Sequence, residues 1–493
     1  EIRLSLVGSE MCIRDRYWAQ RPQVQYDQRL NLMKDTTVTA NNDTGSPLND
    51  AKTMAKVSTN GTYNAKNYYH NGYWQSLNWD DWTCKYAQIA GDCVDLNTEN
   101  PEVAEKLVEF YGNYIGMGVD AFRVDTTRHI SRLSLNTMFN KQLNAIGGKS
   151  FYMFGEVCCR FSQTWYRGHA SESVPFYTWD EPDTSYSSKW QWENTPEAVN
   201  NNMNLTLEHW AAYDDTTNQP TSDNAFLNGN DYHTPDYSKA SGLGTIDFLM
   251  HWQFDSAGGA FTGALGEDQY FNDSTWNVVY VDSHDYSPDD CQTVRYNAGT
   301  QAWAENMCLM FTFRGIPCLY YGSEVEFQKG VVIDVGPNAP LSETGRAYFG
   351  DYLEGSVTAS DFGDYTASGK VSETLNSTLS QQLIKLNKIR RAVPALQKGQ
   401  YTSVGDMCFK RGYTNPETGE KSFACVAVTN AAEFSDIPNG KYIDAVTGDV
   451  KNVTDGTLTI AASGKGNCRV YVLSSNGYTG ISGKIGDTTT YLK

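Results

Sequence analysis

The sequence has no apolar run approaching the roughly 18 residues of a membrane-spanning helix, so we expect no membrane segment. Positive charge is also scarce, because 39 Lys and Arg residues face 58 Asp and Glu residues and leave a net charge of −19. A chain this acidic is not expected to bind nucleic acid or anionic lipid, since both are polyanions. Disordered acidic chains have few aromatic residues, whereas 13% of these residues are aromatic, so the 493 residues predict a globular protein of about two to four domains.

The eleven cysteines are scattered and lack the paired Cys-x-x-Cys spacing of a zinc site. Cys84 and Cys93 lie close together in a polar loop and are candidates for a disulfide. Cys308 and Cys318 lie in apolar runs, so we expect buried thiols there.

Residues 1–16 (EIRLSLVGSEMCIRDR) have neither the apolar core nor the small-residue cleavage site of a secretory signal peptide. Their composition also differs from that of the Asn-, Thr- and Tyr-rich sequence that begins at Tyr17. We interpret them as a sequencing artefact outside the fold. The polar, weakly charged composition of the rest is typical of an exported protein that handles an uncharged polar ligand. We therefore expect an extracellular protein whose signal peptide is not present in this chain.

Helices and strands are expected to alternate after a loop-rich stretch at residues 17–99. Asn100-Pro101-Glu102 is a helix start, with a capping residue, a proline at the first position and an acid in the first turn. Alternating helices and strands with short connections predict a parallel α/β fold. The expected helices cover residues 101–116, 130–146 and 379–391, and the expected strands cover residues 119–125, 151–156, 245–250, 276–281 and 316–321.

From about Pro394 the sequence changes to short strands separated by turns, which predicts a β-sandwich over residues 394–474. Its strands are expected at residues 401–411, 421–429, 441–446 and 457–473. Residues 475–493 are rich in Gly, Thr and Ser and are interpreted as a linker. The catalytic region then covers residues 100–393, with a polar, Trp-rich insertion at about 160–242 whose tryptophans either pack a larger domain or grip a sugar polymer.

Three acidic residues end three of the expected strands: Asp125, Glu156 and Asp285. Asp125 and Glu156 are about one strand–helix–strand unit apart in the sequence. This spacing places them on neighbouring parallel strands, whose carboxyl ends lie at the same edge of the sheet. Cleaving a glycosidic bond needs one carboxylic acid for the leaving oxygen and one carboxylate for the anomeric carbon. Arg123 lies on the same side of its strand as Asp125 and is expected to hold that carboxylate ionised. Each carboxylate taken singly is weak evidence, because a lone Asp at a strand end is more often structural or solvated.

Five ordered segments resemble the conserved regions of the α-amylase family of glycoside hydrolases, over about residues 65–473 and most weakly across 160–240. They are Asp92–Asn97 (DCVDLN), Gly118–His129 (GVDAFRVDTTRH), Phe154–Val157 (FGEV), Tyr280–Asp285 (YVDSHD) and Arg314–Glu324 (RGIPCLYYGSE). The resemblance implies a (β/α)8 TIM barrel with a loop-rich B domain, here residues 17–99, and a C-terminal antiparallel β-sandwich.

The resemblance also implies roles for individual residues. Asp125 is then the nucleophile, Glu156 the general acid and base, and Asp285 the third catalytic carboxylate. Arg123 orients Asp125, and His284 binds sugar hydroxyls. Arg128 and His129 match a basic pair that binds substrate on the leaving-group side and favours α-1,4 bonds, with Arg in place of the family's Lys.

A structural Ca²⁺ is implied by the same resemblance, with Asp95 and the backbone carbonyl of His129 as ligands. Asp95 is also compatible with a turn or capping role. Tyr69, Trp74, Trp79 and Trp82 are candidates for stacking on sugar rings or for packing the loop domain's own core.

The family's Asp-x-x-x-x-Asn-His motif, on the third barrel strand, is not found in this sequence. We interpret the chain as lacking the first three barrel strands, which predicts exposed sheet edges, poor folding and little activity.

The expected function is retaining, endo-acting hydrolysis of α-1,4-glucans such as starch, by a monomer whose partner is an α-glucan polysaccharide or oligosaccharide. A transglycosylase of the same family is an alternative, because no residue here decides whether water is excluded from the acceptor side. A non-catalytic glucan-binding relative is the third reading, although such relatives typically lose a catalytic carboxylate and this chain keeps all three.

Overall fold

The computed structural model describes residues 68, 70, 85, 95–160, 162, 173–181, 184–212, 220–222, 236–335, 340–361 and 364–486. The chain forms two compact units. The first comprises Glu1–Thr221, Asp236–Ile246 and Tyr270–Asn272, and the second comprises Ser222–Pro235, Asp247–Gln269 and Asp273–Lys493. The interpreted artefact at residues 1–16, the Cys84–Cys93 pair and the aromatic residues at 69, 74, 79 and 82 lie outside the described residues.

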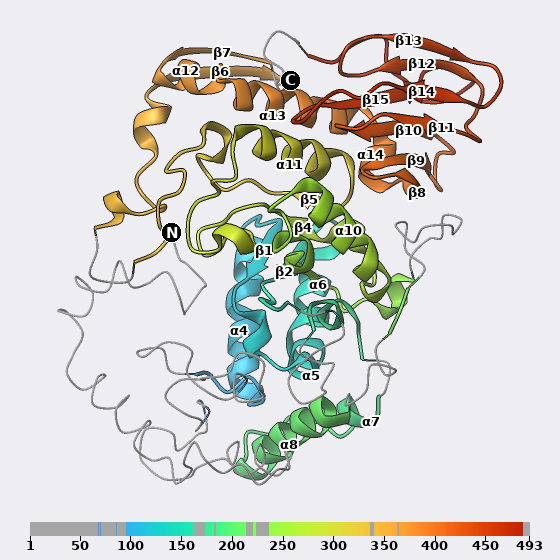
Figure 1. The fold of residues 1–493 in the computed structure, drawn as a ribbon. Coiled ribbons are helices and arrows are strands. Elements are labelled where there is room, and N and C mark those ends of the chain that lie inside the picture. The colour runs from blue at the N-terminus through green and yellow to red at the C-terminus, as the bar shows by residue number, and fades with distance from the viewer. Residues whose placement is uncertain are drawn as a thin grey trace. The chain divides into compact units, whose positions relative to one another are not determined.

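In the first unit, helix α4 (Pro101–Gly116) begins where the sequence predicts (Figure 1). The Asn100 side chain accepts a hydrogen bond from the Glu102 N–H at 3.0 Å, and Pro101 fills the first turn, where a missing N–H costs nothing. Strand β1 (Ala121–Val124) follows and pairs in parallel with β2 (Tyr152–Gly155), so that Arg123 lies opposite Phe154. Strand β3 (Gly244–Thr245) pairs in parallel with the other edge of β2.

The connection between β1 and β2 is helical, as predicted, but it is not one regular α-helix. A π-helical segment at its centre widens the turn. The elements are η3 (Thr127–His129), α5 (Arg132–Ser134), η4 (Leu135–Asn140), α6 (Lys141–Gly147) and η5 (Gly148–Ser150).

The described residues of the insertion at about 160–242 contact one another and the segments at 97–99 and 270. Trp179, Trp190 and Trp210 are buried, whereas Trp192 is half exposed. This burial favours packing as the role of its tryptophans; Trp165 lies outside the described residues. Its elements are η8 (Val174–Thr178), α7 (Thr184–Ser187), α8 (Pro196–Ala212) and η10 (Tyr237–Lys239).

In the second unit, β4 (Val278–Val279) and β5 (Ile316–Pro317) pair in parallel, and both are shorter than the predicted strands. The strand predicted at residues 245–250 is wrong beyond Thr245, because Phe248–His251 forms helix α9. The Asp247 side chain accepts a hydrogen bond from the Met250 N–H at 3.0 Å and so caps that helix. The other elements of this part are α10 (Ala257–Glu267), η11 (Asp268–Tyr270), η12 (Ser274–Trp276), η13 (Asp289–Cys291), α11 (Thr300–Thr312), η14 (Ser323–Val325), η15 (Leu341–Glu343) and η16 (Gly350–Leu353).

The predicted helix near residue 379 is confirmed as α13 (Thr378–Ala392). The hairpin of β6 (Gly355–Asp361) and β7 (Asp364–Gly369), which the sequence does not predict, precedes it in the chain. Helices α12 (Lys370–Leu375) and α14 (Pro394–Lys398) flank α13 in the sequence.

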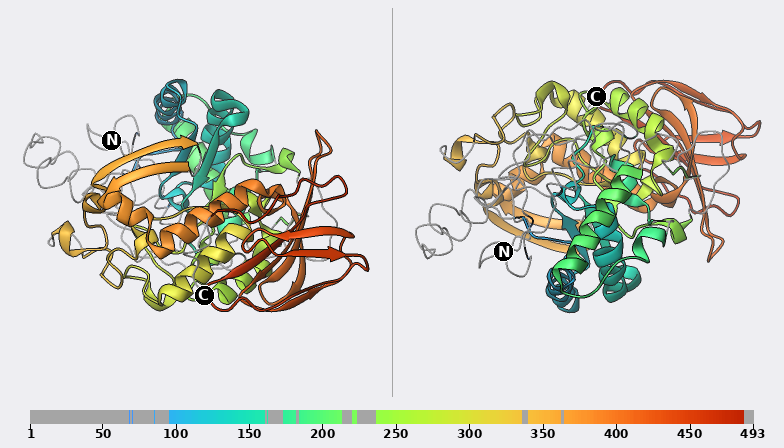
Figure 2. Two further views of the ribbon diagram at one scale, coloured as in Figure 1. Left: turned by 90° about the horizontal axis from the view of Figure 1, so that it is seen from above. Right: turned by 90° about the horizontal axis from the view of Figure 1, so that it is seen from below.

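The C-terminal strands form an antiparallel six-stranded sheet in the order β13-β12-β15-β10-β9-β8, drawn in orange and red in Figure 2. A two-stranded sheet, β11-β14, packs its buried side chains with those of the larger sheet. The strand predicted at residues 401–411 is a hairpin, because the chain reverses at Met407, whose φ is 51°. The strands are β8 (Gln400–Gly405), β9 (Cys408–Thr414), β10 (Lys421–Val428), β11 (Ala432–Phe434), β12 (Gly440–Asp444), β13 (Val450–Val453), β14 (Leu458–Ile460) and β15 (Cys468–Leu473).

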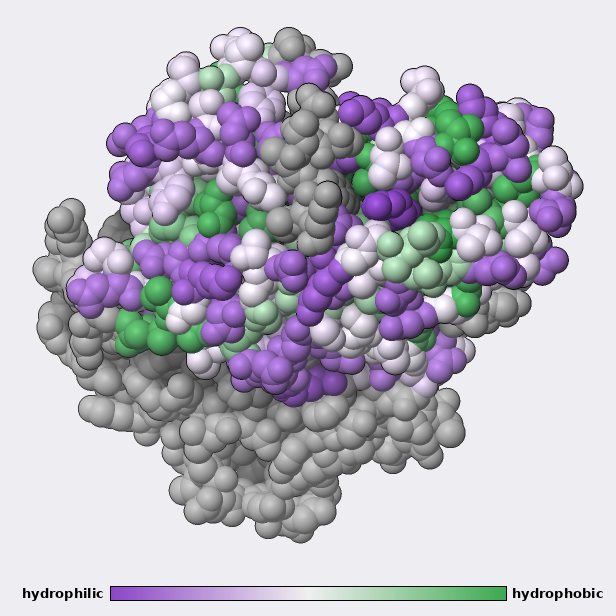
Figure 3. Space-filling model, turned by 45° about the horizontal axis from the view of Figure 1, so that its top comes forward, coloured by the Kyte–Doolittle hydropathy of each residue, from purple (hydrophilic) through white to green (hydrophobic). Residues whose placement is uncertain are grey.

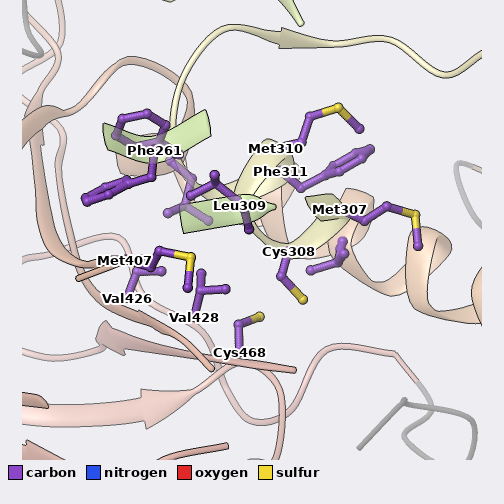
Figure 4. Close-up of a cluster of buried hydrophobic side chains, with 14 of the residues drawn as sticks. Phe261, Met307, Cys308, Leu309, Met310, Phe311, Met407, Val426, Val428 and Cys468 are labelled. Atoms are coloured by element: carbon purple, nitrogen blue, oxygen red, sulfur yellow. The ribbon is translucent and has the colours of Figure 1, made fainter. Parts of the chain in front are cut away.

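The largest hydrophobic cluster described in the second unit joins α11 to the six-stranded sheet and includes residues of α10, α13 and α14. Figure 4 shows Leu309 and Cys308 of α11 beside Val426, Val428 and Cys468 of the sheet. Cys308 is buried as predicted, but Cys318 is exposed, so the prediction of a buried thiol at residue 318 is wrong. Hydrophilic residues cover much of the described surface on the face drawn in Figure 3. Among the described residues, no helix is both long enough and apolar enough to cross a membrane.

Candidate active site

In the first unit, the guanidinium of Arg123 contacts both Asp125 and Glu156. Arg123 donates a hydrogen bond from Nη1 to Asp125 Oδ1, and its Nη2 lies 3.3 Å from Glu156 Oε2. The Thr126 N–H donates to the same Glu156 oxygen at 3.1 Å. Charge-assisted bonds of this kind fix the position of both carboxylates as well as attracting them.

The parallel pairing of β1 and β2 explains this geometry. The Glu156 N–H donates to the Val124 carbonyl at 2.8 Å, so the ladder continues one residue past Gly155 and presents Glu156 beside the end of β1. Thr126 then turns the chain through the left-handed region, with φ of 46°. A Cβ at Gly155 would lie 2.5 Å from Thr127 Oγ1, so the turn can approach β2 this closely only because residue 155 is glycine.

Asp285 lies in the second unit, where two cationic or polar side chains hold its two oxygens. Arg346 Nη2 lies 2.7 Å from Asp285 Oδ1, and His284 Nε2 lies 2.8 Å from Oδ2. Ser283 Oγ accepts from the Asp285 N–H at 3.1 Å, which holds the turn that presents the carboxylate. The side chain of Asp285 keeps 30% of its surface exposed, so it remains open to a ligand.

Arg346 is a site residue that the sequence does not reveal. Besides Asp285, it binds the His284 carbonyl through Nε at 2.7 Å and Asp334 Oδ2 through Nη1 at 3.0 Å. It lies far beyond Asp285 in the chain, in a segment without regular periodicity, and no spacing rule connects the two. Asp125 and Glu156 belong to one unit and Asp285 to the other, so the convergence of all three carboxylates stays a prediction.

Arg128 and His129, predicted to bind substrate, lie on η3 directly after the turn at Thr126. Both are buried, and Arg128 donates from Nη1 to the Cys158 carbonyl at 2.8 Å. The Arg128 backbone carbonyl in turn accepts from Lys85 Nζ. Their role in substrate binding stays a prediction.

Asp95, the predicted calcium ligand, is paired with a histidine. His70 Nδ1 lies 2.8 Å from Asp95 Oδ2, and its Nε2 lies 2.6 Å from Glu99 Oε2. Burial alone would lower the pKa of His70, but the two carboxylates outweigh that effect and raise its pKa to about 10. Burial raises the pKa of Asp95, against the opposing charge of His70.

Calcium binding at Asp95 stays a prediction, and the donors present do not fit it well. A buried imidazolium beside Asp95 repels a divalent cation, and Ca²⁺ needs six to eight oxygen ligands. No group of three or more His, Cys, Asp or Glu residues within the described part of the chain is arranged to hold a metal ion.

The sequence profile of the family described as "Alpha amylase, catalytic domain" matches residues 51–338. An alpha-amylase of Streptomyces lividans is 24% identical over 372 residues, covering 74% of this chain and 33% of that protein. A cyclomaltodextrin glucanotransferase of Klebsiella oxytoca is 22% identical over 466 residues, covering 85% of this chain and 56% of that protein. The chain thus spans about a third to a half of these relatives.

Among solved structures, an alpha-amylase from Geobacillus thermoleovorans complexed with acarbose shares 17% identity, with a TM-score of 0.48, over 87% of this chain and 81% of that one. The family profile covers more than half of the chain and includes Asp125, Glu156 and Asp285. The chain therefore belongs to the α-amylase family of glycoside hydrolases, whose fold is a (β/α)8 barrel followed by a C-terminal β-sheet domain.

Proposed function

We propose that the protein is a retaining, endo-acting hydrolase of α-1,4-glucans such as starch, that is, an α-amylase. The observation that carries this proposal is the bridge that Arg123 makes between Asp125 and Glu156 at the ends of two neighbouring parallel strands. Two carboxyl groups on adjacent strands suit the separation of about 5–5.5 Å that a retaining mechanism needs.

In the proposed first step, the Asp125 carboxylate attacks the anomeric carbon and forms a C–O bond while the glycosidic C–O bond breaks. Glu156 gives its proton to the leaving oxygen in the same step. In the second step, water attacks the anomeric carbon and loses a proton to Glu156, and the bond to Asp125 breaks. Both carboxyl groups return to their starting states, so the cycle balances with water as the only co-reactant.

The remaining predicted residues have supporting roles in the proposed reaction. Asp285 and His284 bind sugar hydroxyls and stabilise the positively charged transition state, and Arg346 holds Asp285 in place. Arg128 and His129 act on the leaving-group side. In this proposal, the protein acts outside the cell and is a monomer.

Transfer of the glycosyl group to another sugar is a second candidate, favoured by the similarity to a cyclomaltodextrin glucanotransferase. Both reactions share the first step and differ in whether water or a sugar hydroxyl attacks the intermediate. Chromatography of the products from a linear maltooligosaccharide separates them: hydrolysis gives only shorter linear sugars, whereas transfer gives longer or cyclic ones.

Azide rescue tests the assignment of the two carboxylates. A Glu156→Ala variant acting on an activated α-glycoside is expected to form the α-glycosyl azide, because azide replaces water in the second step. An Asp125→Ala variant is expected to form the β-glycosyl azide, because azide replaces the nucleophile itself. The exposed Asp120→Asn, on the same strand segment, is the matched control and keeps full activity.

Full hydrolysis by either alanine variant would overturn the assignment, and so would azide products of the opposite configuration. Loss of activity in both variants with retained binding of the oligosaccharide, but no azide product, would show that both side chains are needed for hydrolysis and would contradict the nucleophile and acid/base roles assigned to them.

A further inference from the structure

Arg295 is a buried arginine whose guanidinium contacts the segments that follow β4 and β5 in the second unit. Its side chain is 1% exposed, and its Nε donates to Asp282 Oδ2 at 3.0 Å, three residues before Asp285. Its Nη2 donates to the Tyr321 carbonyl at 3.1 Å and to Ser323 Oγ at 3.0 Å. Asp282 follows β4 and the other two partners follow β5, so one planar side chain joins the ends of two paired strands.

The third nitrogen of this guanidinium, Nη1, binds the backbone next to Arg346. It donates to the Gly345 carbonyl at 3.0 Å, and the Tyr321 hydroxyl donates to the Ala347 carbonyl at 3.0 Å. The residues on both sides of Arg346 are therefore held by hydrogen bonds from buried or half-buried groups. Arg346 itself lies 2.7 Å from Asp285 Oδ1 through its Nη2, so the position of this backbone decides whether that contact can form.

Gly345 lies against the aliphatic stem of Arg295. A Cβ at residue 345 would lie 2.7 Å from Arg295 Cγ and 3.0 Å from its Cδ. Gly345 does not lie at a positive φ, so the side-chain contact, and not the backbone conformation, favours glycine here. Backbone bonds hold the same place, because the Arg295 N–H donates to the Val331 carbonyl at 2.9 Å and the Gly345 N–H to the Val332 carbonyl at 2.8 Å.

Asp282 and Tyr320 hold the guanidinium from two directions. Arg295 Cζ lies 4.5 Å from the centroid of the Tyr320 ring, which is a cation–π distance. Asp282 also accepts a hydrogen bond from Ser323 Oγ at 2.7 Å. Asp282 therefore keeps a donor when Arg295 is replaced, and we expect the main effect of a replacement at the Gly345 carbonyl.

We propose that Arg295 is a positioning residue of the reaction, which acts by fixing Arg346 through the Gly345 carbonyl so that Arg346 can hold Asp285. Arg295 is enclosed by protein and does not touch the sugar. The inference rests on the proposed function, because it assigns Arg295 a part in the chemistry of Asp285.

A double-mutant comparison tests the route through Arg346. The ammonium of Arg295→Lys cannot reach all the acceptors that the guanidinium binds, so kcat on a maltooligosaccharide should fall about tenfold. In an Arg346→Met background the same replacement should lower kcat by less than about threefold, because the contact through which Arg295 acts is already lost. Equal fold losses in the two backgrounds would overturn the proposal.

Arg411→Lys is the matched control for a purely structural effect. Arg411 is also fully buried in the second unit and donates to the carbonyls of Gly399 and Thr312. Its replacement should lower the melting temperature but leave kcat within about twofold of wild type. Gly345→Ala, whose Cβ displaces the stem of Arg295, should lower kcat as Arg295→Lys does. An equal loss of kcat in Arg411→Lys would overturn the proposal.

Crystal structures of Arg295→Lys and Gly345→Ala test the geometry without any activity. We expect Arg346 Nη2 to lie beyond hydrogen-bonding distance of Asp285 Oδ1 in both variants. Retention of this contact in both would overturn the proposal, and if Arg295→Lys does not fold, Gly345→Ala decides. A wild type that neither hydrolyses nor transfers glucans would contradict the proposed function, whereas these two structures would still decide the positioning role.

Discussion

Replacing Arg123 tests whether one guanidinium organises the proposed catalytic pair. Its two nitrogens reach Asp125 and Glu156, which a lysine ammonium cannot do in the same planar, two-pronged way. A hydrogen bond to a charged group contributes about 1.5–3 kcal/mol, and the 31% exposure of Arg123 places each bond at the low end of that range. Losing one bond in Arg123→Lys then costs about 1.5 kcal/mol, or roughly tenfold in rate, and losing both in Arg123→Met costs roughly a hundredfold.

The assay is kcat and KM on a maltooligosaccharide, measured for both variants beside Arg391→Lys, an exposed arginine, as the control. We expect the loss to fall mainly on kcat, since Arg123 acts on the reacting carboxylates and is not proposed to grip distant sugars. Circular dichroism and melting temperature verify that the variants are folded. If Arg123→Lys and Arg123→Met both kept kcat within about twofold of wild type, the reasoning from this geometry would be refuted.

Three further predictions concern charge in the second unit. Arg346→Met is expected to lower kcat roughly 10–100-fold by releasing Asp285, whereas Asp334→Asn, which leaves that contact in place, should lower it less; steady-state kinetics compares them. Arg314→Met leaves the buried carboxylates of Asp247 and Asp268 without their cation, so the free energy of unfolding measured in urea should fall by about 3–5 kcal/mol. A decrease below about 1 kcal/mol would contradict this prediction. Burial lowers the pKa of Lys385 to about 8, so its charged form destabilises the fold at neutral pH, a penalty that disappears as pH rises from about 8 to 10.5. Lys385→Met loses the bond to the Val446 carbonyl but removes that charge, so it should unfold at higher urea than wild type at pH 7 and at lower urea above about pH 10.

The features that sequence reasoning predicts well are those fixed by neighbouring residues. Asn100 and Pro101 start α4 because capping and proline geometry act within one turn. Arg123 meets Asp125 because residues two apart on a strand face the same side. The parallel pairing of β1 and β2 follows from the helical crossover between them, because a crossover of this kind returns the chain to the same end of the sheet.

The features that escaped prediction depend on contacts distant in the chain. Arg346 and Asp285 are 61 residues apart in the sequence, and His70 and Glu99 are 29 residues apart. No periodic pattern in the sequence predicts either contact. The strand predicted at residues 245–250 failed for a local reason: an apolar run of that length fits a buried strand or a short helix, and the capping Asp247 decides for the helix. For a short apolar run, the polar residues that flank it therefore decide between a strand and a helix.

The acids of this chain that bind an arginine differ in how much of their side chain remains exposed. Asp247 and Asp282 each bind a buried arginine, and their side chains are 0% and 4% exposed. Asp125 and Asp285 also bind arginines, yet their side chains keep 14% and 30% of their surface open. A carboxylate with no exposed surface cannot contact a sugar, whereas one that is held on one side and open on the other can contact a sugar ring without losing its orientation. The same type of ion pair thus serves structure or chemistry according to whether its second face reaches solvent, and on that criterion Asp125 and Asp285 are the strand-end acids that a glucan can contact.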